Sequence, residues 1–375
     1  MISSVGAGFP GPLTRDGAGS RPMGDGQMWR ILAVALLLTT AVTSAQNQGR
    51  YVRLVPIPQA NEEWDSAVVN GKLYLFGGNP VAEGGKQGAP PGRVFEYDPA
   101  ADRWTAKKPM PQPAHHNGVV GYNGKIYVFG GGVQRQAGGP TQFPIDNSWE
   151  YDPAADSWRA LAPMPVRRLA AAAVESGGKI YVMGGVGQYP GMENQSMSGE
   201  EPHRVLDLNH MYDPATNTWQ PKQTMPTARN HMFVGAVNGK VYVIGGRVGS
   251  MSVATGSTTD LVEEYDIAAD RWGAVKLRMP TPRDGGVVGV YQNRVFVAGG
   301  QSITGINNSV SRALEAYDPA TNTWTAYPFL PQARHGQGGG VIGNRFHVIS
   351  GHLTAAFSGG EPLNVTTHDA FEFPR

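Results

Sequence analysis

A pair of glycines recurs along this chain about every fifty residues, and two aromatic residues follow each of the first five pairs. The pairs are Gly77-Gly78, Gly130-Gly131, Gly184-Gly185, Gly245-Gly246 and Gly299-Gly300, with Ser350-Gly351 as a degenerate sixth. The aromatic residues are Tyr97, Tyr151, Tyr212, Tyr265 and Tyr317, and then Trp104, Trp158, Trp219, Trp272 and Trp324. A fixed period of this length indicates a repeat architecture, in which each repeat packs on its neighbours.

One repeat has the pattern of four short strands. The first, such as 118–122, ends at an Asn-Gly pair, which is the strongest short signal for a hairpin. The second, such as 125–129, is rich in β-branched and aromatic residues and ends at the glycine pair. After a loop of variable length, a third strand ends in Tyr-Asp-Pro and a fourth begins near the tryptophan. Because glycine has no side chain, we expect the Tyr and Trp rings to approach the glycine pairs closely.

This pattern resembles the kelch repeat, and the resemblance covers nearly all of residues 50–375. Kelch repeats imply an all-β fold, the β-propeller, in which each repeat forms one four-stranded blade around a central channel. The resemblance is specific because the motif recurs in five good copies.

The sixth repeat lacks a fourth strand. Its first three strands are expected at 339–341, 345–349 and 370–373, with Phe373 in the place of the tyrosine. The N-terminal residues 51–58 match residues 104–111 position by position, so Tyr51 corresponds to a tryptophan. We therefore predict a six-bladed kelch propeller over residues 46–375, whose last blade is closed by the N-terminal strand. Closure of this kind removes an exposed sheet edge.

Composition excludes several classes of function. The chain has no cysteine, which excludes disulfides and thiol catalysis. The net charge of +1 gives no reason to expect nucleic acid or a membrane surface as a partner. The 51 glycines and 29 prolines belong to turns between regular apolar strands and do not indicate disorder. We expect a monomer.

Residues 28–45 have the plan of a secretory signal peptide. Arg30 precedes an apolar core at 31–42, and Thr43-Ser44-Ala45 provides a cleavage site. The core is shorter than the roughly 20 apolar residues of a membrane span, so we expect no stable membrane insertion. Residues 1–27 have no pattern and are interpreted as an unstructured or mis-assigned extension. The Asp-Pro-Ala-Ala-Asp turns favour a bacterial source, and the expected location is secreted or periplasmic.

Alternation of strand direction assigns the loops to two faces of the propeller. The loop after each second strand and the segment between blades emerge on one face, and the turns after the first and third strands emerge on the other. Loops on the first face are long and irregular, at 79–92, 132–146, 186–206, 247–259, 301–311 and 352–367. Variable loops on a rigid scaffold are where binding residues usually lie, so this loop face is the candidate site.

Charged residues of the inter-blade segments add to this prediction. An arginine stands three residues after the closing proline in four repeats, at Arg168, Arg229, Arg283 and Arg334. Neighbouring positions contribute His115, His116, His231, His335, Glu62 and Glu63. A guanidinium group binds oxyanions bidentately, so these ten residues form the predicted ligand-binding set. The resemblance implies the same, because some kelch propellers bind acidic peptides with equivalent arginines. In the alternative interpretation, the arginines bond backbone carbonyls of the adjoining blade.

The histidines raise the question of a metal. His116, His231 and His335 come from alternating blades and could approach the channel axis. Metal ligation needs contacts of about 2 Å and close convergence, which the spacing of blades makes demanding. We therefore assign neither a metal nor a cofactor from the sequence.

Two classes of function remain in competition. The first is a non-catalytic interaction module that binds an acidic peptide or a glycan at the loop face of the channel. The alternative is a sugar-acid mutarotase or epimerase of the sialic-acid type, which a resemblance to envelope kelch enzymes implies. That activity needs a carboxylate base and an arginine, and Glu62, Glu63, Glu200 or Glu201 could pair with Arg229 or Arg283. Copper radical chemistry of the galactose oxidase type needs a Cys-Tyr cross-link and is excluded by the absence of cysteine.

Overall fold

The computed structural model describes residues 49–79, 89–197, 204–249, 258–304, 308–356 and 363–374. The proposed extension at 1–27 and signal peptide at 28–45 lie outside this part of the chain. All regular structure in the described ranges is β-strand. None of the described residues belongs to a helix that is long and apolar enough to cross a bilayer.

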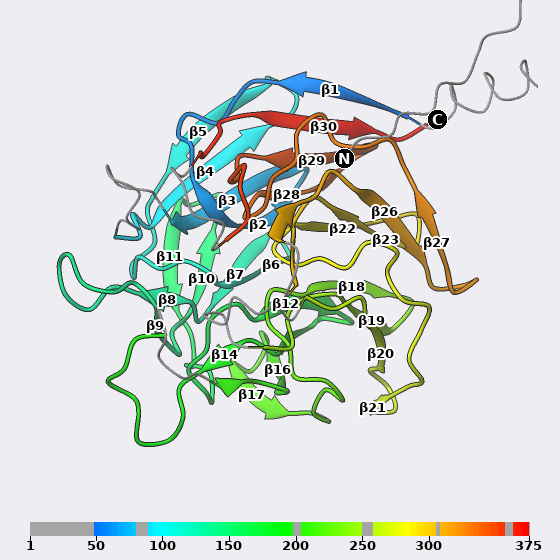
Figure 1. Cartoon of the computed structure of the whole chain (residues 1–375). Coiled ribbons are helices and arrows are strands. Elements are labelled where there is room, and N and C mark those ends of the chain that lie inside the picture. The colour runs from blue at the N-terminus through cyan, green and yellow to red at the C-terminus, as the bar shows by residue number, and fades with distance from the viewer. Residues whose placement is uncertain are drawn as a thin grey trace, which may run out of the picture. The chain divides into compact units, whose positions relative to one another are not determined.

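Six four-stranded sheets form the blades, which confirms the predicted six-bladed β-propeller. Figure 1 shows the sheets arranged around a common centre. The first blade contains β2 (Glu62–Val69), β3 (Lys72–Asn79), β4 (Arg93–Asp98) and β5 (Arg103–Lys107). The second contains β6 (Gly118–Tyr122), β7 (Lys125–Phe129), β10 (Ser148–Asp152) and β11 (Ser157–Ala160). The third contains β12 (Ala172–Ser176), β13 (Lys179–Met183), β16 (Asn209–Asp213) and β17 (Thr218–Pro221).

The remaining blades repeat this plan. The fourth contains β18 (Phe233–Val237), β19 (Lys240–Ile244), β20 (Val262–Asp266) and β21 (Arg271–Trp272). The fifth contains β22 (Val287–Tyr291), β23 (Arg294–Ala298), β26 (Leu314–Asp318) and β27 (Thr323–Ala326). The sixth contains β28 (Gly338–Ile342), β29 (Arg345–Ile349), β30 (His368–Glu372) and β1 (Arg50–Leu54). All neighbouring strands within these sheets are antiparallel, so each blade is an up-and-down sheet.

The turn between the first and second strands has the predicted conformation. Asn70-Gly71, Asn123-Gly124 and Asn238-Gly239 all have positive φ, for example 51° and 71° in the first pair. Two consecutive positive φ angles define the type I′ turn, whose twist matches that of the strands it joins. The Asn-Gly pairs therefore set the register of the inner hairpins.

The inter-blade segments lie on the same face as the loops after the second strands, as predicted. Five of the segments form an isolated bridge with the start of the loop of their own blade, as Asn230 does with Arg247 and His335 with His352. In the first blade, the pairing of Glu62 with Asn79 is part of the ladder of β2 and β3. Three loops carry short ladders, formed by β8 (Gly132–Val133) with β9 (Phe143–Pro144), β14 (Val186–Gly187) with β15 (Arg204–Val205), and β24 (Gln301–Ile303) with β25 (Asn308–Val310).

The backbone of the next inter-blade segment approaches the glycine pairs closely, whereas aromatic rings were expected to do so. A Cβ atom on Gly245 would lie 2.6 Å from the carbonyl oxygen of Arg283, in the inter-blade segment that follows. That same oxygen accepts a hydrogen bond from the N–H of Gly246 at 3.1 Å. Both glycines have positive φ, at 58° and 89°. The pair thus lets the next inter-blade segment dock on the blade edge, because a side chain there would collide with the docked backbone.

Tyrosine and tryptophan hold adjacent blades together through a repeated hydrogen-bond unit, here called the Tyr–Asx–Trp clamp. The tyrosine O–H donates to an Asp or Asn five residues later, over 2.6–2.8 Å, at Asp102, Asp156, Asn217, Asp270 and Asn322. The same carboxylate or amide oxygen accepts an N–H from the preceding blade, at Val55, Lys108, Ala162, Gln223 and Leu277. The tryptophan indole donates to the carbonyl of that same residue. Each clamp therefore satisfies both backbone groups of one residue of the neighbouring blade.

The N-terminal strand closes the ring, as predicted. β1 pairs antiparallel with β30, and Figure 1 shows the two strands, blue and red, side by side. Tyr51 stands opposite Phe371, as each tryptophan stands opposite its tyrosine. The predicted counterpart Phe373 is therefore wrong by two residues, since β30 begins at His368 and not at Ala370.

The sixth clamp is adapted to this closure. Phe371 has no hydroxyl group with which to orient an Asx residue. The hydroxyl group of Tyr51 donates to the carbonyl of Pro328 at 3.0 Å, in the place of an indole. Proline has no N–H, so this interface needs no acceptor from an Asx residue.

Two buried histidines mark the closing blade. Nδ1 of His347 lies 2.8 Å from Nε2 of His368, and both rings pack on Tyr97 of the first blade. Burial, aided by the charge of Arg345, lowers the pKa of His347 to about 4, and burial holds the pKa of His368 well below its usual value. Both side chains are therefore neutral in the folded protein at neutral pH.

This pair predicts a loss of stability in acid. The folded-state pKa values lie below the unfolded value of about 6.5, so the unfolded chain binds more protons between pH 6.5 and 4. The stability is complete above pH 6.5 and declines as the pH falls towards 4. For His347, the loss at pH 5 is about 2 kcal/mol. The other blades carry Tyr or Phe in place of His347 and Val at two of the positions equivalent to His368. We expect the double variant His347→Phe, His368→Val to lose less stability than the parent between pH 7.5 and pH 5, measured by urea unfolding. Equal losses in the two proteins would contradict this assignment.

Candidate functional site

Six turns of the inter-blade segments meet around the channel at the loop face. The third residue of each turn is Glu63, His116, Ala170, His231, Gly285 or Gly336, here called the channel ring. All six have left-handed φ angles, between 52° and 62°. Backbone hydrogen bonds link neighbouring positions, including Ala170 N–H to His116 O at 2.9 Å and Gly336 N–H to Gly285 O at 2.8 Å. The ring is thus a regular consequence of closing six equivalent blades.

Four members of the channel ring, Glu63, His116, Ala170 and His231, have side chains that this conformation disfavours. Gly285 and Gly336 adopt a left-handed φ without strain, whereas Glu63 at 55°, His116 at 56° and His231 at 52° do not. Non-glycine residues in this region cost about 1 kcal/mol each, and such strain clusters at functional sites. Glutamate and histidine at these positions indicate that their side chains serve a purpose at the channel.

A cavity of about 130 Å³ lies among the first residues of the six innermost strands. Its walls include all six members of the channel ring and residues that follow them, such as Asp65, Asn117 and Gln337. Hydrogen-bonding atoms of these walls lack protein partners among the described residues. They are Nε2 and Oε1 of Gln337, Oδ1 of Asn117 and Nε1 of Trp64. The cavity is therefore lined in part by polar residues that have unpaired donors and acceptors.

The structure brings together three members of the predicted ligand-binding set. Possible ligand atoms of Glu63, His116 and His231 all lie within 4.8 Å of one another. Nε2 of His116 is 3.4 Å from Oε2 of Glu63, and the rings of His116 and His231 are 5.0 Å apart. The small side chain of Ala170 stands between the two histidines in the ring order and leaves their rings in contact.

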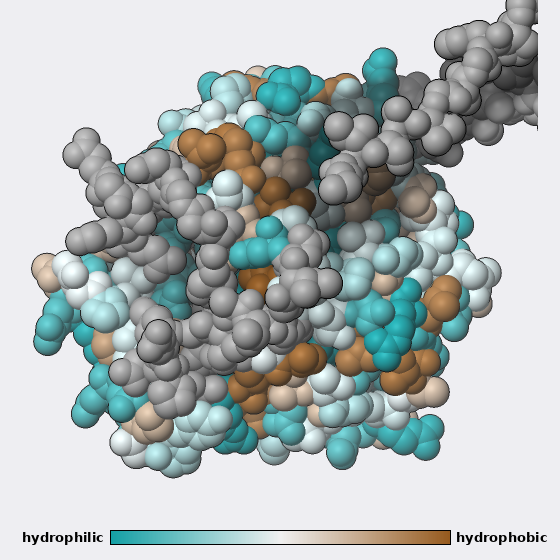
Figure 2. Space-filling view, viewed as in Figure 1, coloured by the Kyte–Doolittle hydropathy of each residue, from teal (hydrophilic) through white to brown (hydrophobic). Residues whose placement is uncertain are grey.

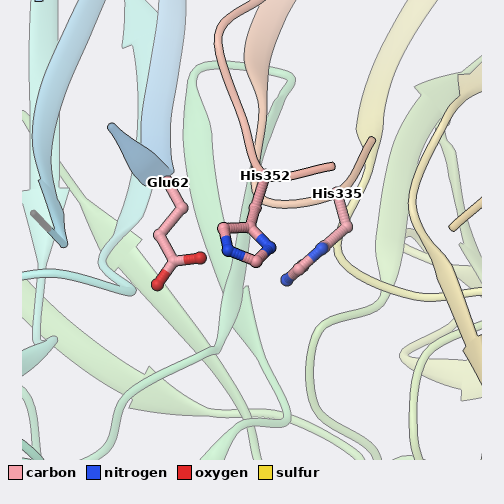
Figure 3. A group of neighbouring side chains, drawn as sticks. All are labelled: Glu62, His335 and His352. Atoms are coloured by element: carbon pink, nitrogen blue, oxygen red, sulfur yellow. The ribbon is translucent and has the colours of Figure 1, made fainter. Parts of the chain in front are cut away.

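A second group lies beside the first. Figure 3 shows Glu62, at the start of β2, with His335 and His352 from the sixth blade. Their possible ligand atoms also lie within 4.8 Å of one another. Nε2 of His335 is 4.0 Å from Oε1 of Glu63, so the two groups adjoin each other.

Burial makes the histidines of the site neutral. It lowers the pKa values of His115 and His116 to about 3 and that of His335 to about 4. The pKa of His231 is also far below its usual value, because of burial and the nearby charge of Arg247. Neutral imidazole offers a lone pair, whereas imidazolium has none.

The carboxyl groups are shifted in the opposite direction. Burial raises the pKa values of Glu62 and Asp65 to about 8, although hydrogen bonds from Asn117 oppose the shift at Asp65. Burial also raises the pKa of Glu63, opposed by the nearby His335 and Arg247. A carboxyl group with a pKa of about 8 can hold or release a proton near neutral pH.

The four predicted arginines occupy a different environment from the one expected of ligand-binding groups. Their side chains are fully buried and bond to the blade that follows them. Nη2 of Arg283 donates to Val297 O at 3.0 Å, and Nη1 is 2.5 Å from Glu315. Arg168, Arg229 and Arg334 bond in the same way to Val182, Val243 and Val348, and to His210, Glu263 and Asp369. This geometry supports the alternative in which the arginines are structural, and their role in ligand binding stays a prediction.

The repeats themselves explain the pairing. Each partner of an arginine stands two residues before the tyrosine position of the blade, at His210, Glu263, Glu315 and Asp369. The two blades without an arginine have Asn61 or Ala114 instead, and they carry Phe95 or Trp149 at the partner position. Arginine is therefore present where an acceptor is present and absent where an aromatic residue fills the space.

Of the other predicted residues, His115 is buried behind His116, with its Nε2 2.9 Å from Thr141 O. Neither Glu62 nor Glu63 pairs with Arg229 or Arg283, whose carboxylate partners are Glu263 and Glu315. Glu200 and Glu201 lie outside the described residues.

Sequence reasoning missed Asp65, Asn117, Gln337, Arg247 and His352. The last two follow a glycine pair directly, and their bridges to Asn230 and His335 place them at the channel.

Comparison with known proteins places this architecture in a family. Residues 162–351 match the model described as KLHDC2/KLHL20/DRC7 Kelch-repeats domain, and residues 113–165 match the Kelch motif. Kelch-like protein terF of Aspergillus terreus is 28% identical over 289 residues, which are 76% of this chain and 60% of that protein. Kelch-like protein 15 of Danio rerio is 29% identical over 71% of this chain and 42% of its own length. The chain thus spans 60% or less of the length of these relatives.

A solved structure shares the fold. The structure titled "Structure of YjhT" superposes with a TM-score of 0.67 and covers 84% of this chain and 95% of that one. The sequences are 20% identical, so the likeness concerns the fold alone.

The buried arginines lead to a test of stability. Replacing Arg229 by alanine leaves Glu263 buried without its partner, and we expect Arg229→Ala to lower the free energy of unfolding by about 3–5 kcal/mol. The double variant Arg229→Ala, Glu263→Trp copies the Ala114 and Trp149 pair of the second blade and should recover most of that loss. Urea unfolding followed by circular dichroism measures both. An Arg229→Ala protein as stable as the parent would show that the arginine is not a structural element.

Proposed function

Because this chain belongs to the kelch-repeat family, whose propellers generally bind protein partners, we propose that it is an exported interaction module. Its channel mouth would receive a hydroxyl-rich ligand, namely a glycan. The observation that carries the choice of ligand is the cavity of about 130 Å³, whose lining residues include some with unpaired hydrogen-bonding atoms. Small-molecule sites are typically concave and fix orientation with a few well-placed polar groups.

The polar groups of the cavity match hydroxyl groups in kind. Gln337 contributes both a donor and an acceptor, and Asn117 contributes an acceptor. A sugar hydroxyl group can donate a hydrogen bond to an amide oxygen and accept one from an amide nitrogen. Buried polar atoms without partners carry a cost of about 1–3 kcal/mol each, so a ligand that satisfies them gains affinity.

Charge argues against the acidic peptide. The fully buried arginines are bonded within the fold, and Nη2 of Arg247 lies 2.9 Å from the carboxylate of Asp284. The titratable side chains on the cavity wall are Glu63, Asp65 and neutral histidines. A carboxylate ligand would find no uncommitted cation among these residues. Figure 2, in the view of Figure 1, shows the hydrophobic residues of the described surface in separate patches among hydrophilic ones.

A sugar-acid mutarotase or epimerase is the second candidate. Asp65 favours it, because burial raises its pKa to about 8 and it lines the cavity, where Asn117 donates two hydrogen bonds to its carboxyl group. Such a group can exchange a proton with a sugar hydroxyl near neutral pH. The enzyme would lack a free arginine for the carboxylate of a sugar acid, which makes it the weaker candidate.

Ligand choice can be tested by calorimetric titration with neutral monosaccharides, N-acetylneuraminic acid and a glutamate-rich peptide. We expect a neutral sugar to bind, and Gln337→Leu to weaken its binding about tenfold, because two hydrogen bonds are lost. Gln220→Ala, an exposed glutamine on β17, is the control and should bind as the parent does. Binding of the peptide alone would overturn the proposal. Anomer exchange followed by NMR on the same sugars decides between the candidates, since acceleration that Asp65→Asn abolishes would establish the enzyme.

Export rests on the signal-peptide plan of residues 28–45. We expect the full-length chain, expressed in a Gram-negative bacterial host, to accumulate in the periplasm with Gln46 as its first residue. Mass spectrometry of the fractionated protein measures this. An intact chain that remains in the cytoplasm would contradict export.

A further inference from the structure

Glu63, His116 and His231 occupy equivalent places in three blades and converge on one point of the channel. All their possible ligand atoms lie within 4.8 Å of one another, and all three residues hold left-handed φ angles that glycine adopts more readily. The hydrogen bonds behind the two histidine rings determine what these atoms can bind.

A chain of hydrogen bonds sets the tautomer of His116. Nε2 of His115 lies 2.9 Å from Thr141 O, and because a carbonyl accepts only, that nitrogen carries the hydrogen. Nδ1 of His115 is then an acceptor, and it contacts Nδ1 of His116. The hydrogen of His116 must therefore be on Nδ1, which leaves a lone pair on Nε2. That lone pair is 3.4 Å from the carboxyl oxygen of Glu63.

The second histidine is oriented in the same way. The side-chain nitrogen of Asn230 donates to Gly249 O at 3.1 Å, so its side-chain oxygen is the atom that faces His231. Nδ1 of His231 is 2.6 Å from that oxygen and must donate to it. Nε2 of His231 therefore also has a lone pair. Metal-binding histidines characteristically donate the other ring N–H to an outer partner in this manner, which fixes ring orientation.

Two imidazole lone pairs and a carboxyl group that lie close together suit a cation bound between them. Ligand atoms at the corners of a tetrahedron around zinc, at bonds of about 2.1 Å, are about 3.4 Å apart. The distance between His116 and Glu63 has this value. Two imidazoles and one carboxylate bind divalent first-row metals and leave coordination positions open.

The neighbouring group is less suited to a metal. Nδ1 of His352 is 2.7 Å from Thr354 O, and its Nε2 accepts the N–H of Leu363 at 3.2 Å. Both ring nitrogens of His352 are therefore occupied by the protein, although Figure 3 shows its ring close to Glu62 and His335.

We propose that Glu63, His116 and His231 form a binding site for a divalent transition metal ion, with His115 and Asn230 as positioning residues. All three ligands line the cavity, so the open coordination positions face the space where a ligand would enter. The proposal goes beyond the binding of a glycan and does not depend on it.

The test is titration of the tag-free, chelator-treated protein with Zn²⁺ by calorimetry and with Co²⁺ by absorption spectroscopy. We expect one equivalent of metal to bind and Co²⁺ to give the intense visible bands of a low-coordinate site. His116→Gly and His231→Gly copy the residues of the fifth and sixth blades and remove backbone strain. Each should weaken Zn²⁺ binding at least about 100-fold. Without metal, each should melt at the parent temperature or about 2 °C above it, so the loss is not caused by unfolding.

His352→Gln is the matched control, because it alters the neighbouring group alone, and it should bind Zn²⁺ within about twofold of the parent. Binding that survives both glycine variants, or that His352→Gln abolishes, would overturn the assignment. The absence of binding to the parent at 100 µM Zn²⁺ and pH 7.5 would overturn it as well.

Discussion

Each blade of this propeller depends on its neighbour through the Tyr–Asx–Trp clamp. A tyrosine orients an Asp or Asn, and that residue and the tryptophan together bond both backbone groups of one residue in the preceding blade. A single four-stranded sheet has two faces to cover and cannot do so alone. Because the clamp recurs at successive interfaces, each blade completes the hydrogen bonding of the preceding one, and the ring as a whole becomes the stable unit.

The same closure creates the candidate site. Six equivalent turns meet at the channel with left-handed backbone, which would suit glycine at every position. Ala170, Glu63, His116 and His231 depart from that choice. The side chains of the last three converge at the channel. A rigid ring of this kind positions ligand atoms without contributions from the long loops, which frees the loops to vary.

The periodicity of the sequence predicted the fold well because the clamp and hairpin residues recur in order. Tyr51 could be recognised as the displaced partner of the sixth blade from its spacing alone. The structural role of Arg283 could not be recognised from spacing, because spacing gives the position of a residue along the chain and not its depth in the fold. Its acceptor Glu315 was visible in the repeats, but only a comparison of position with position would have revealed the pairing. Nor could the left-handed turn at His231 be foreseen, since only Gly285 and Gly336 signal it by residue type.

The pairing of β1 with β30 has a consequence for how the protein is made. Arg50 and Glu372 are 322 residues apart, and they are neighbours in the closing sheet. During synthesis β1 emerges before any complete blade, and it cannot pair until β30 has been made. Until then, β1 has no strand partner, and unpaired strands promote association with other chains. Contacts between residues so far apart in the sequence also slow folding, because the chain loses entropy on closing the loop before strand pairing contributes any stability. The ring is therefore completed in one late step, after the final strand becomes available.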